Sequence, residues 1–349
     1  MKRRWPLLLA LLPLLLGMAV YGHYWRGWAA GLETTLARWF PGSGARVGGF
    51  PYRLEAELAG VSLAHAGETR LALAAARLRL NRGPWRPELT VFQGEGISLN
   101  AWAPGLAPGL AAGLAARVTA AAATASLKIM PDAAGLDRLA RLSIVLAKTR
   151  GNAGIGPDFR ADSLELHARE IIEPDATNTS SASPTLIPGL PARLPARLPD
   201  RGQLVIGAAG FALGQGAPIN LAADLSVRGA GRLDGVRRWA DRGGSLDAVL
   251  TGSDATGELF KLEATIVPLG AGGSAGLRLA GTITTVCPLA VQAALNGTAA
   301  PAEQRLRSAV RLALETALPA GGAVALSGVP GDLATRPRRG QVPACPRLG

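Results

Sequence analysis

Ser274 is the residue whose setting most resembles a nucleophile. It stands in Gly272 to Gly276, the GxSxG pattern that in esterases places a serine on a sharp turn between a strand and a helix. In that architecture the catalytic histidine follows the serine, whereas His23, His65 and His167 all precede it. The residues after the motif also continue in a strand-like pattern. We therefore interpret the motif as a glycine-rich hairpin loop, with an envelope hydrolase as a remote alternative.

Other kinds of active site are also missing from the sequence. The three histidines are too far apart for paired metal ligands, and the chain has no GxxxxGK[ST] loop and no GxGxxG motif opening a helix. Carboxylates occur mainly at alternating positions, where a solvated strand face is the ordinary explanation: Glu55, Glu57, Asp162 and Glu165. Without a pocket that perturbs its pKa, none of them is a general acid or base. The sequence predicts no enzymatic activity, no cofactor and no metal.

Cys287 and Cys345 are the only cysteines, and each is followed by a proline. Two thiols are too few for a structural zinc site. In an oxidising compartment they could form one disulfide that ties the C-terminal tail to the body. The alternative is two unpaired cysteines.

The net charge of +12 comes mostly from arginines that are scattered along the chain. A nucleic-acid surface gathers its cations on one face, with stacking aromatic residues among them, and no such pattern occurs here. We therefore predict no nucleic-acid partner. The basic clusters at the two ends suit anionic lipid head groups.

The first 41 residues have the order of a membrane anchor: positive charges, then an apolar run, then aromatic residues. From Trp5 to Trp25 the segment reaches the ~20 residues that a helix needs to cross a bilayer. The residues that define this anchor are Lys2, Arg3, Arg4, Leu7, Leu12, Leu16, Val20, Tyr24, Trp25 and Trp28. We predict a single-pass inner-membrane protein with its body in the periplasm.

A cleaved signal peptide and a buried soluble helix are the alternatives to the anchor. Cleavage needs small residues after the apolar core, and Met18 to Trp25 is bulky there, which disfavours it. Beyond the apolar run, Trp25, Trp28, Leu32, Leu36 and Trp39 recur at three- and four-residue steps and predict that the helix continues to Pro41. That stripe could lie at the lipid interface or dock on the body.

The remaining chain is predicted to be α+β and predominantly β, a curved antiparallel sheet built from two similar halves. With 48% apolar residues a folded core is expected. Alternating strands are predicted in a first half, 45–172, and a second half, 202–333. The predicted strands are 54–58, 71–73, 78–80, 88–92, 96–101, 125–130, 142–148, 163–168, 203–213, 219–228, 245–250, 259–267, 277–285 and 323–326.

Segments of different composition and periodicity separate these strands. Residues 104–123 are rich in Ala and Gly and predict a loop followed by helix, and 233–241 predicts another helix. Residues 173–201 carry regularly spaced prolines and predict a surface loop or linker. Leu306, Val310, Leu314 and Leu318 predict a helix near the C-terminus, and 334–349 form a basic tail.

Gly49, Phe50, Pro51, Tyr52 and Arg53 form a turn into the first long strand, shortly after the anchor and the Trp-bearing helix. Together with Trp85-Arg86-Pro87 and the closing segment Val324 to Gly328, this turn resembles the domain of unknown function 2125 family, proteobacterial envelope proteins. The resemblance covers nearly the whole chain and implies no activity and no catalytic residues. The general pattern is also similar to AsmA-like envelope proteins, whose curved sheets are thought to shield lipid chains.

The leading hypothesis is a non-enzymatic, membrane-anchored periplasmic protein whose curved sheet binds or shields a lipid or another hydrophobic ligand. Small apolar residues on one strand face would leave room for such a guest. The alternative is a ligand-free scaffold or assembly factor for an envelope protein complex. The expected partners are the membrane and either a lipid or an envelope protein.

Overall fold

The computed structural model describes residues 5–66, 70–103, 114–131, 135, 137–152, 158–171, 200–229, 236–255, 257–269, 276–285 and 333–334. For residues 5–10, 103, 114, 137, 236–237, 268–269, 276–285 and 333–334 only the backbone is described. Several predictions fall outside the described residues: the charges Lys2, Arg3 and Arg4, the Pro-rich segment to residue 199, Ser274, both cysteines, the C-terminal helix, the 323–326 strand and the basic tail after Ala334.

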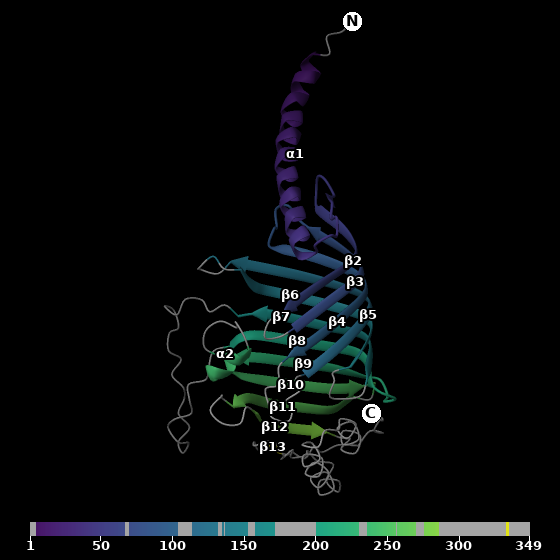
Figure 1. The fold of residues 1–349 in the computed structure, drawn as a ribbon, viewed down its shortest axis with the longest axis vertical. Helices are drawn as coiled ribbons and strands as arrows, with labels where there is room; N and C mark the ends of the chain where they lie inside the picture. The colour runs from purple at the N-terminus through teal and green to yellow at the C-terminus, as the bar shows by residue number, and fades with distance from the viewer. Residues whose placement is uncertain are drawn as a thin grey trace.

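The described chain forms one large sheet whose strands follow each other in space in the order of the sequence (Figure 1). Neighbouring strands are antiparallel except β12 and β13, which are parallel. The strands are β1 Val47–Gly48, β2 Leu54–Ala66, β3 Arg70–Arg82, β4 Leu89–Ala103, β5 Leu114–Pro131, β6 Asp137–Asn152, β7 Phe159–Glu170, β8 Asp200–Leu213, β9 Ile219–Arg228, β10 Ser245–Asp254, β11 Gly257–Leu269, β12 Gly276–Thr285 and β13 Leu333–Ala334.

The two halves that the sequence suggests are joined in this sheet. Strand β7 ends before the Pro-rich segment and β8 begins after it, yet they pair directly, as in Leu166 with Ile206. The sheet is twisted along its length, so that the strands nearest the N-terminal helix are inclined to those at the far end. The predicted antiparallel, mainly β architecture is confirmed.

One face of the sheet is apolar from strand to strand. Directly paired residues in an antiparallel sheet point to the same side. Two such rows cross the sheet: Leu58, Leu78, Gly94, Ala123, Leu146, Leu164, Ala208, Leu221, Gly252 and Phe260, and Ala56, Leu80, Phe92, Ala125, Ile144, Leu166, Ile206, Ala223, Leu250 and Leu262. We call this side the inner face and the opposite side the outer face.

A third row interrupts the two-residue alternation. Gly60, Gly96, Lys148 and Gly210, on β2, β4, β6 and β8, all have positive φ, between 52 and 62°. At this row the inner-face residues are three positions apart instead of two, as at Leu58 and Val61. The apolar pattern therefore changes phase without leaving the inner face. We call these four residues and the positions opposite them on the neighbouring strands the kink row.

The kink row explains where the predicted strands were too short. Residues 71–73 and 78–80 belong to the single strand β3. The predicted strands 88–92, from residue 89 on, and 96–101 both belong to β4. The expected helix within 104–123 is wrong for the described part, because residues 114–123 lie in β5. Alanine favours helices, but β5 has a paired strand on each side, and this context overrides the local preference.

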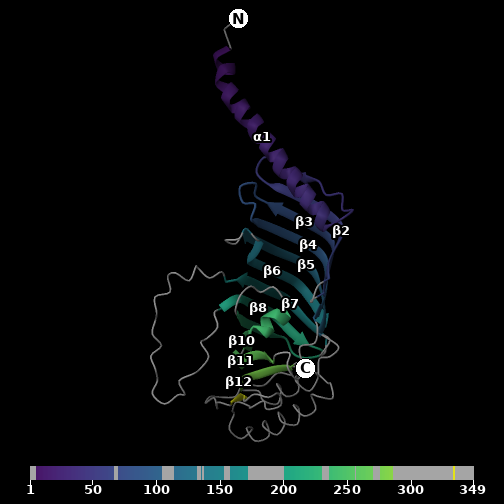
Figure 2. The same cartoon turned by 60° about the vertical axis from the view of Figure 1, so that its left-hand side comes forward.

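Within the described residues, two helices accompany the sheet. Helix α1, Trp5–Trp39, ends just before Pro41 as predicted, and α2, Val236–Asp241, falls within the predicted 233–241. The C-terminal part of α1 lies on the inner face of β2 and β3, and the N-terminal part extends away from the sheet (Figure 2). Its buried stripe is Trp25, Ala29, Leu32 and Leu36, and Phe40, directly after the helix, is buried with them.

Candidate apolar binding site

A cavity of about 450 Å³ opens on the inner face where α1 ends. Its walls come from α1 and from five consecutive strands, β2 to β6. The lining residues are Trp39, Phe40, Leu63, Leu73, Leu78, Phe92, Gly94, Ile97, Leu99, Val118, Ala120, Ala123, Ala125, Leu127, Ile129, Ile144 and Leu146. No lining side chain carries a charge or a hydrogen-bonding group other than the Trp39 indole. The volume is in the ~300–1,000 Å³ range of small-molecule sites.

Small residues make the room in this cavity. Gly94 on β4 and Ala120, Ala123 and Ala125 on β5 occupy inner-face positions between larger leucines, isoleucines and phenylalanines. The Ala-rich part of β5, which suggested a helix in the sequence, is thus the floor of the cavity. Such a surface can hold an apolar guest through burial of hydrocarbon but offers it no directed hydrogen bond.

Arg82 is a cation at an inner-face register position, opposite Leu54 and Thr90. Its Nε atom is buried and has no hydrogen-bond partner. Burial lowers the pKa of the Arg82 guanidinium, and the Glu88 carboxylate acts in the opposite direction. The residue sits at the end of β3 that faces the aromatic loops described below, not among the cavity walls.

Helix α1 has two different parts. Leu36, in the second part, faces the sheet and is 0% exposed, whereas Leu16, in the first part, is 63% exposed. The exposed apolar residues of the first part are Leu11, Leu12, Leu14, Leu15, Leu16, Met18 and Val20. Of the two placements that the sequence left open for the stripe, the structure shows docking on the body at Trp25, Leu32 and Leu36, while Trp28 and Trp39 lie at its margins.

The structure also bears on the predicted membrane crossing. Among the residues whose side chains it describes, which exclude 1–10, no helix is both long and apolar enough to cross a membrane.

The turn Gly49 to Arg53 fastens the helix to the sheet. The Tyr21 hydroxyl donates a hydrogen bond to the carbonyl oxygen of Pro51, and the Trp25 indole donates to that of Arg53 at 3.4 Å. Gly49 has φ +92°, and a Cβ there would lie 2.7 Å from the Arg53 carbonyl oxygen, so only glycine fits.

Aromatic rings extend this contact. Tyr21 stacks on Trp85, from the loop between β3 and β4, with ring centroids 5.4 Å apart. Phe50 packs edge-on against Trp25 at 5.4 Å, and Trp28 against Trp85 at 6.3 Å. The sequence pointed to the turn and to Trp85 by resemblance only; the structure shows that both hold α1.

The outer face is polar. Arg77 pairs with Glu57 at 3.3 Å and with Glu95 at 3.6 Å, and Arg79 pairs with Glu55 at 3.3 Å. The carboxylates that the sequence placed on a solvated strand face, Glu55 and Glu57, therefore take part in ion pairs. These side chains are largely exposed, apart from the partly buried Glu55, so the pairs are weak contributors to stability.

A serine, a histidine and a carboxylate also meet on the outer face. His167 Nδ1 lies 3.0 Å from Ser143 Oγ, and His167 Nε2 lies 3.7 Å from a Glu165 oxygen. The group resembles a catalytic triad in composition. All three side chains stand on regular paired strands, and none lines any of the cavities described here.

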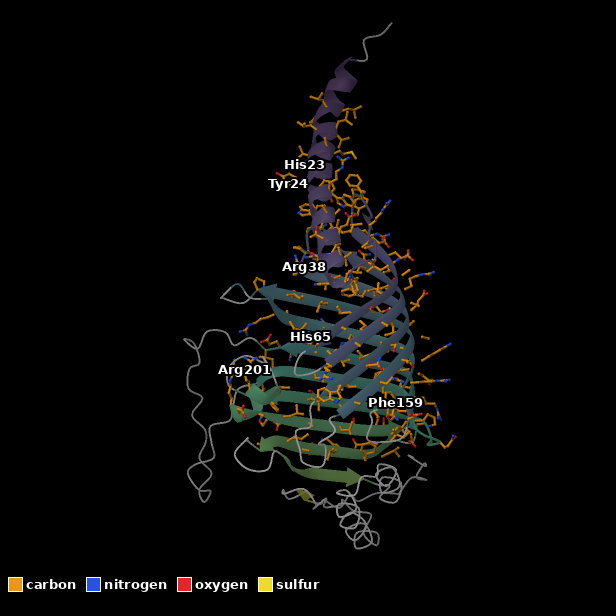
Figure 3. All side chains as sticks on the ribbon, in the orientation of Figure 1. His23, Tyr24, Arg38, His65, Phe159 and Arg201 are labelled. Atoms are coloured by element: carbon orange, nitrogen blue, oxygen red, sulfur yellow. The ribbon has the colours of Figure 1, made fainter. Side chains whose placement is uncertain are left out.

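The other histidines are not part of such a group. Figure 3 shows His23 on α1, well above the sheet, and His65 on the sheet itself. His23 lies against the Tyr24 ring, with centroids 5.9 Å apart. His65 lines a more polar cavity of about 630 Å³ at the far ends of β2 to β5, where Arg70 lies over the Trp102 ring at 4.8 Å. In the described part of the chain no cluster of histidine, cysteine and acidic residues could hold a metal ion.

The described residues define a class: a protein in which a long helix docks on a mainly antiparallel sheet whose inner face is apolar. Residues 38–343 match the family described as uncharacterized protein conserved in bacteria (DUF2125), and the chain belongs to this family. Comparison with curated proteins and with solved structures finds no match.

Proposed function

We propose that the protein is a non-enzymatic, membrane-anchored envelope protein whose inner sheet face binds a lipid chain or another hydrophobic ligand. The observation that carries the proposal is the cavity between α1 and strands β2 to β6, which is lined by apolar side chains. A role in shielding lipid, as in AsmA-like proteins, is consistent with this site.

The anchor is the first part of α1. Seven large apolar side chains between residues 11 and 20 are exposed to solvent, which is unfavourable in water and natural within a bilayer. The backbone of the helix already begins at Trp5, so the helical segment to Trp25 has the ~20 residues required. The charges Lys2 to Arg4 precede it and favour a cytoplasmic N-terminus. The body then lies in the periplasm, attached to the inner membrane.

Binding of a hydrocarbon chain would be driven by its removal from water. Each buried CH₂ group contributes ~0.8 kcal/mol. Because the cavity walls provide no charged group, and no hydrogen-bonding side chain except the Trp39 indole, affinity is expected to follow chain length. The ligand would be selected by its apolar part, and the cavity would accept related chains.

The test is mass spectrometry of what remains bound to the full-length protein after gentle detergent extraction. The Ala123→Phe variant fills the cavity floor, and Ala122→Phe adds the same ring on the exposed outer face. We expect bound lipid in the wild type and in Ala122→Phe, and its loss in Ala123→Phe. Equal lipid in both variants, or none in the wild type, would contradict the proposal. Another envelope protein recovered in place of lipid would favour the scaffold alternative.

A further inference from the structure

Two loops of the body lie beside α1 at the level where it leaves the sheet. They are residues 49–53, before β2, and residues 83–88, between β3 and β4. Tyr52 is 80% exposed and Trp85 is 63% exposed, and Phe50, Tyr24 and Trp28 beside them are also exposed. Ring contacts of 5.4 to 6.3 Å from Tyr21, Trp25 and Trp28 fix both loops to the helix.

The position of these loops along α1 is defined by the helix itself. Val20 is the last large apolar residue of the exposed stretch, and Tyr21 to Trp28 follow directly. At 1.5 Å per residue, the contacts with the loops lie within about 12 Å of Val20 along the axis. A helix that enters the hydrocarbon at Trp5 leaves it after ~30 Å, near Tyr24. The loops therefore lie at the depth of the head groups.

Their chemistry matches that depth. Tyr and Trp combine an apolar ring with a hydrogen-bonding group and concentrate at membrane interfaces. The exposed cations Arg26, Arg53 and Arg86 come from the same three segments, and Arg53 is also paired with Glu55 at 3.0 Å. Exposed aromatic rings next to arginines are expected to favour a bilayer surface that contains anionic lipid.

We infer that the loops 49–53 and 83–88 form a second membrane contact, in which the body itself binds the head-group region of an anionic bilayer. The inference goes beyond the cavity and the spanning helix, although its depth estimate rests on the proposed anchor. It gives a function to the exposed Tyr52, which takes no part in the ring contacts with the helix, and to the exposed side of Trp85. A second contact would also fix the tilt of the sheet relative to the membrane, since an anchor helix alone would leave the body free to rotate on the membrane surface.

Photocrosslinking of the full-length chain tests this contact. p-Benzoylphenylalanine replaces Tyr52 or Trp85 in separate proteins, with Leu16 as the bilayer reference and Val249, exposed on the outer face of β10, as the control. Each protein is reconstituted in vesicles of phosphatidylethanolamine and phosphatidylglycerol, irradiated, and analysed for lipid adducts by mass spectrometry.

We expect adduct yields at positions 52 and 85 several-fold above that at 249, and a decrease when phosphatidylglycerol is omitted. Adducts at 16 with only the control yield at 52 and 85 would overturn the inference and leave the anchor intact. Adducts at 52 and 85 but not at 16 would support the inference and overturn the anchor. The Ala123→Phe substitution should leave the yield at 52 unchanged, because Tyr52 is not a cavity residue; a parallel loss would mean that the adduct arises from cavity lipid and would overturn the inference.

Discussion

The inner and outer faces of the sheet are made from the same strands and are nevertheless different surfaces. On β2, Leu58 is 1% exposed beneath α1, while the neighbouring Ala59 is exposed on the other side. On β5, Ala123 lines the cavity and Ala122 lies outside. The difference shows that residue type alone does not decide the role of a position here. The side of the strand decides it, and substitutions in neighbouring pairs should separate the two faces.

A charge on the inner face should have the largest effect. Leu58→Asp would bury an unpaired carboxylate among Leu36, Leu78 and Leu80, and we expect a loss of about 4 kcal/mol or failure to fold. Ala59→Asp should cost less than about 1 kcal/mol, because its carboxylate stays in water. Denaturant unfolding of the full-length chain in mild detergent measures both. Similar losses in the two variants would mean that the faces are not distinct.

The same contrast exists within α1. Leu36→Ala should lower the free energy of unfolding by about 2–5 kcal/mol, because it opens a cavity between the helix and β2. Leu16→Ala removes the same atoms from an exposed position and should leave stability in detergent within about 0.5 kcal/mol of the wild type. Thermal unfolding monitored by circular dichroism compares them. An equal effect at Leu16 would indicate that this part of the helix also packs on protein.

At the kink row the apolar pattern changes phase and still stays on the inner face. Substitution of its glycines should lower stability moderately. Gly96→Ala places a Cβ 3.0 Å from that of Ala76 at φ +61°, and we expect a loss of about 1–2 kcal/mol. Lys148 already has φ +52° without being glycine, so Lys148→Gly should change stability by less than about 1 kcal/mol. The measurement is the denaturant midpoint of each variant. A neutral Gly96→Ala would show that the row tolerates side chains.

The outer ion pairs should matter least. Arg77→Ala removes contacts with Glu57 and Glu95, and since all three side chains are more than half exposed, the expected loss is below about 1 kcal/mol. The loss should shrink further as salt screens the pairs. Unfolding at low and high ionic strength checks this. A large, salt-independent loss would place a structural role on the outer face that its geometry does not suggest.

The sequence predicted most of the sheet because alternation survives in strands such as β9, where Ile219 to Arg228 matches the structure residue for residue. It was wrong where the period changes phase, at the kink row, since a two-residue pattern broken at Ala75 and Ala76 looks like two strands. The helix predicted within residues 104–123 was wrong for another reason. A run of alanines has no alternation to see, and only the paired neighbours β4 and β6 make it a strand.

The candidate site was less accessible to sequence reasoning. The sequence indicated small apolar residues on one strand face. The cavity lining, however, comes from α1 and five strands, and the pairing registers that bring them together cannot be read from composition. The alternation of Leu71, Leu73, Leu78 and Leu80 was a usable signal for the inner face. The family resemblance singled out the two aromatic loops in the sequence. Their contact with Tyr21 depends on how the helix crosses β2, which no local sequence pattern predicts.

The sequential strand order has a consequence for how the molecule assembles. Each described strand pairs only with its neighbours in the chain, so ordering begins with local contacts and needs few distant segments to meet, a topology associated with fast folding. Cooperativity should then act along one dimension, with each hairpin templating the next. Partial opening would start at the edge opposite α1, where hydrogen exchange of β11 and β12 should be faster than that of β3 and β4.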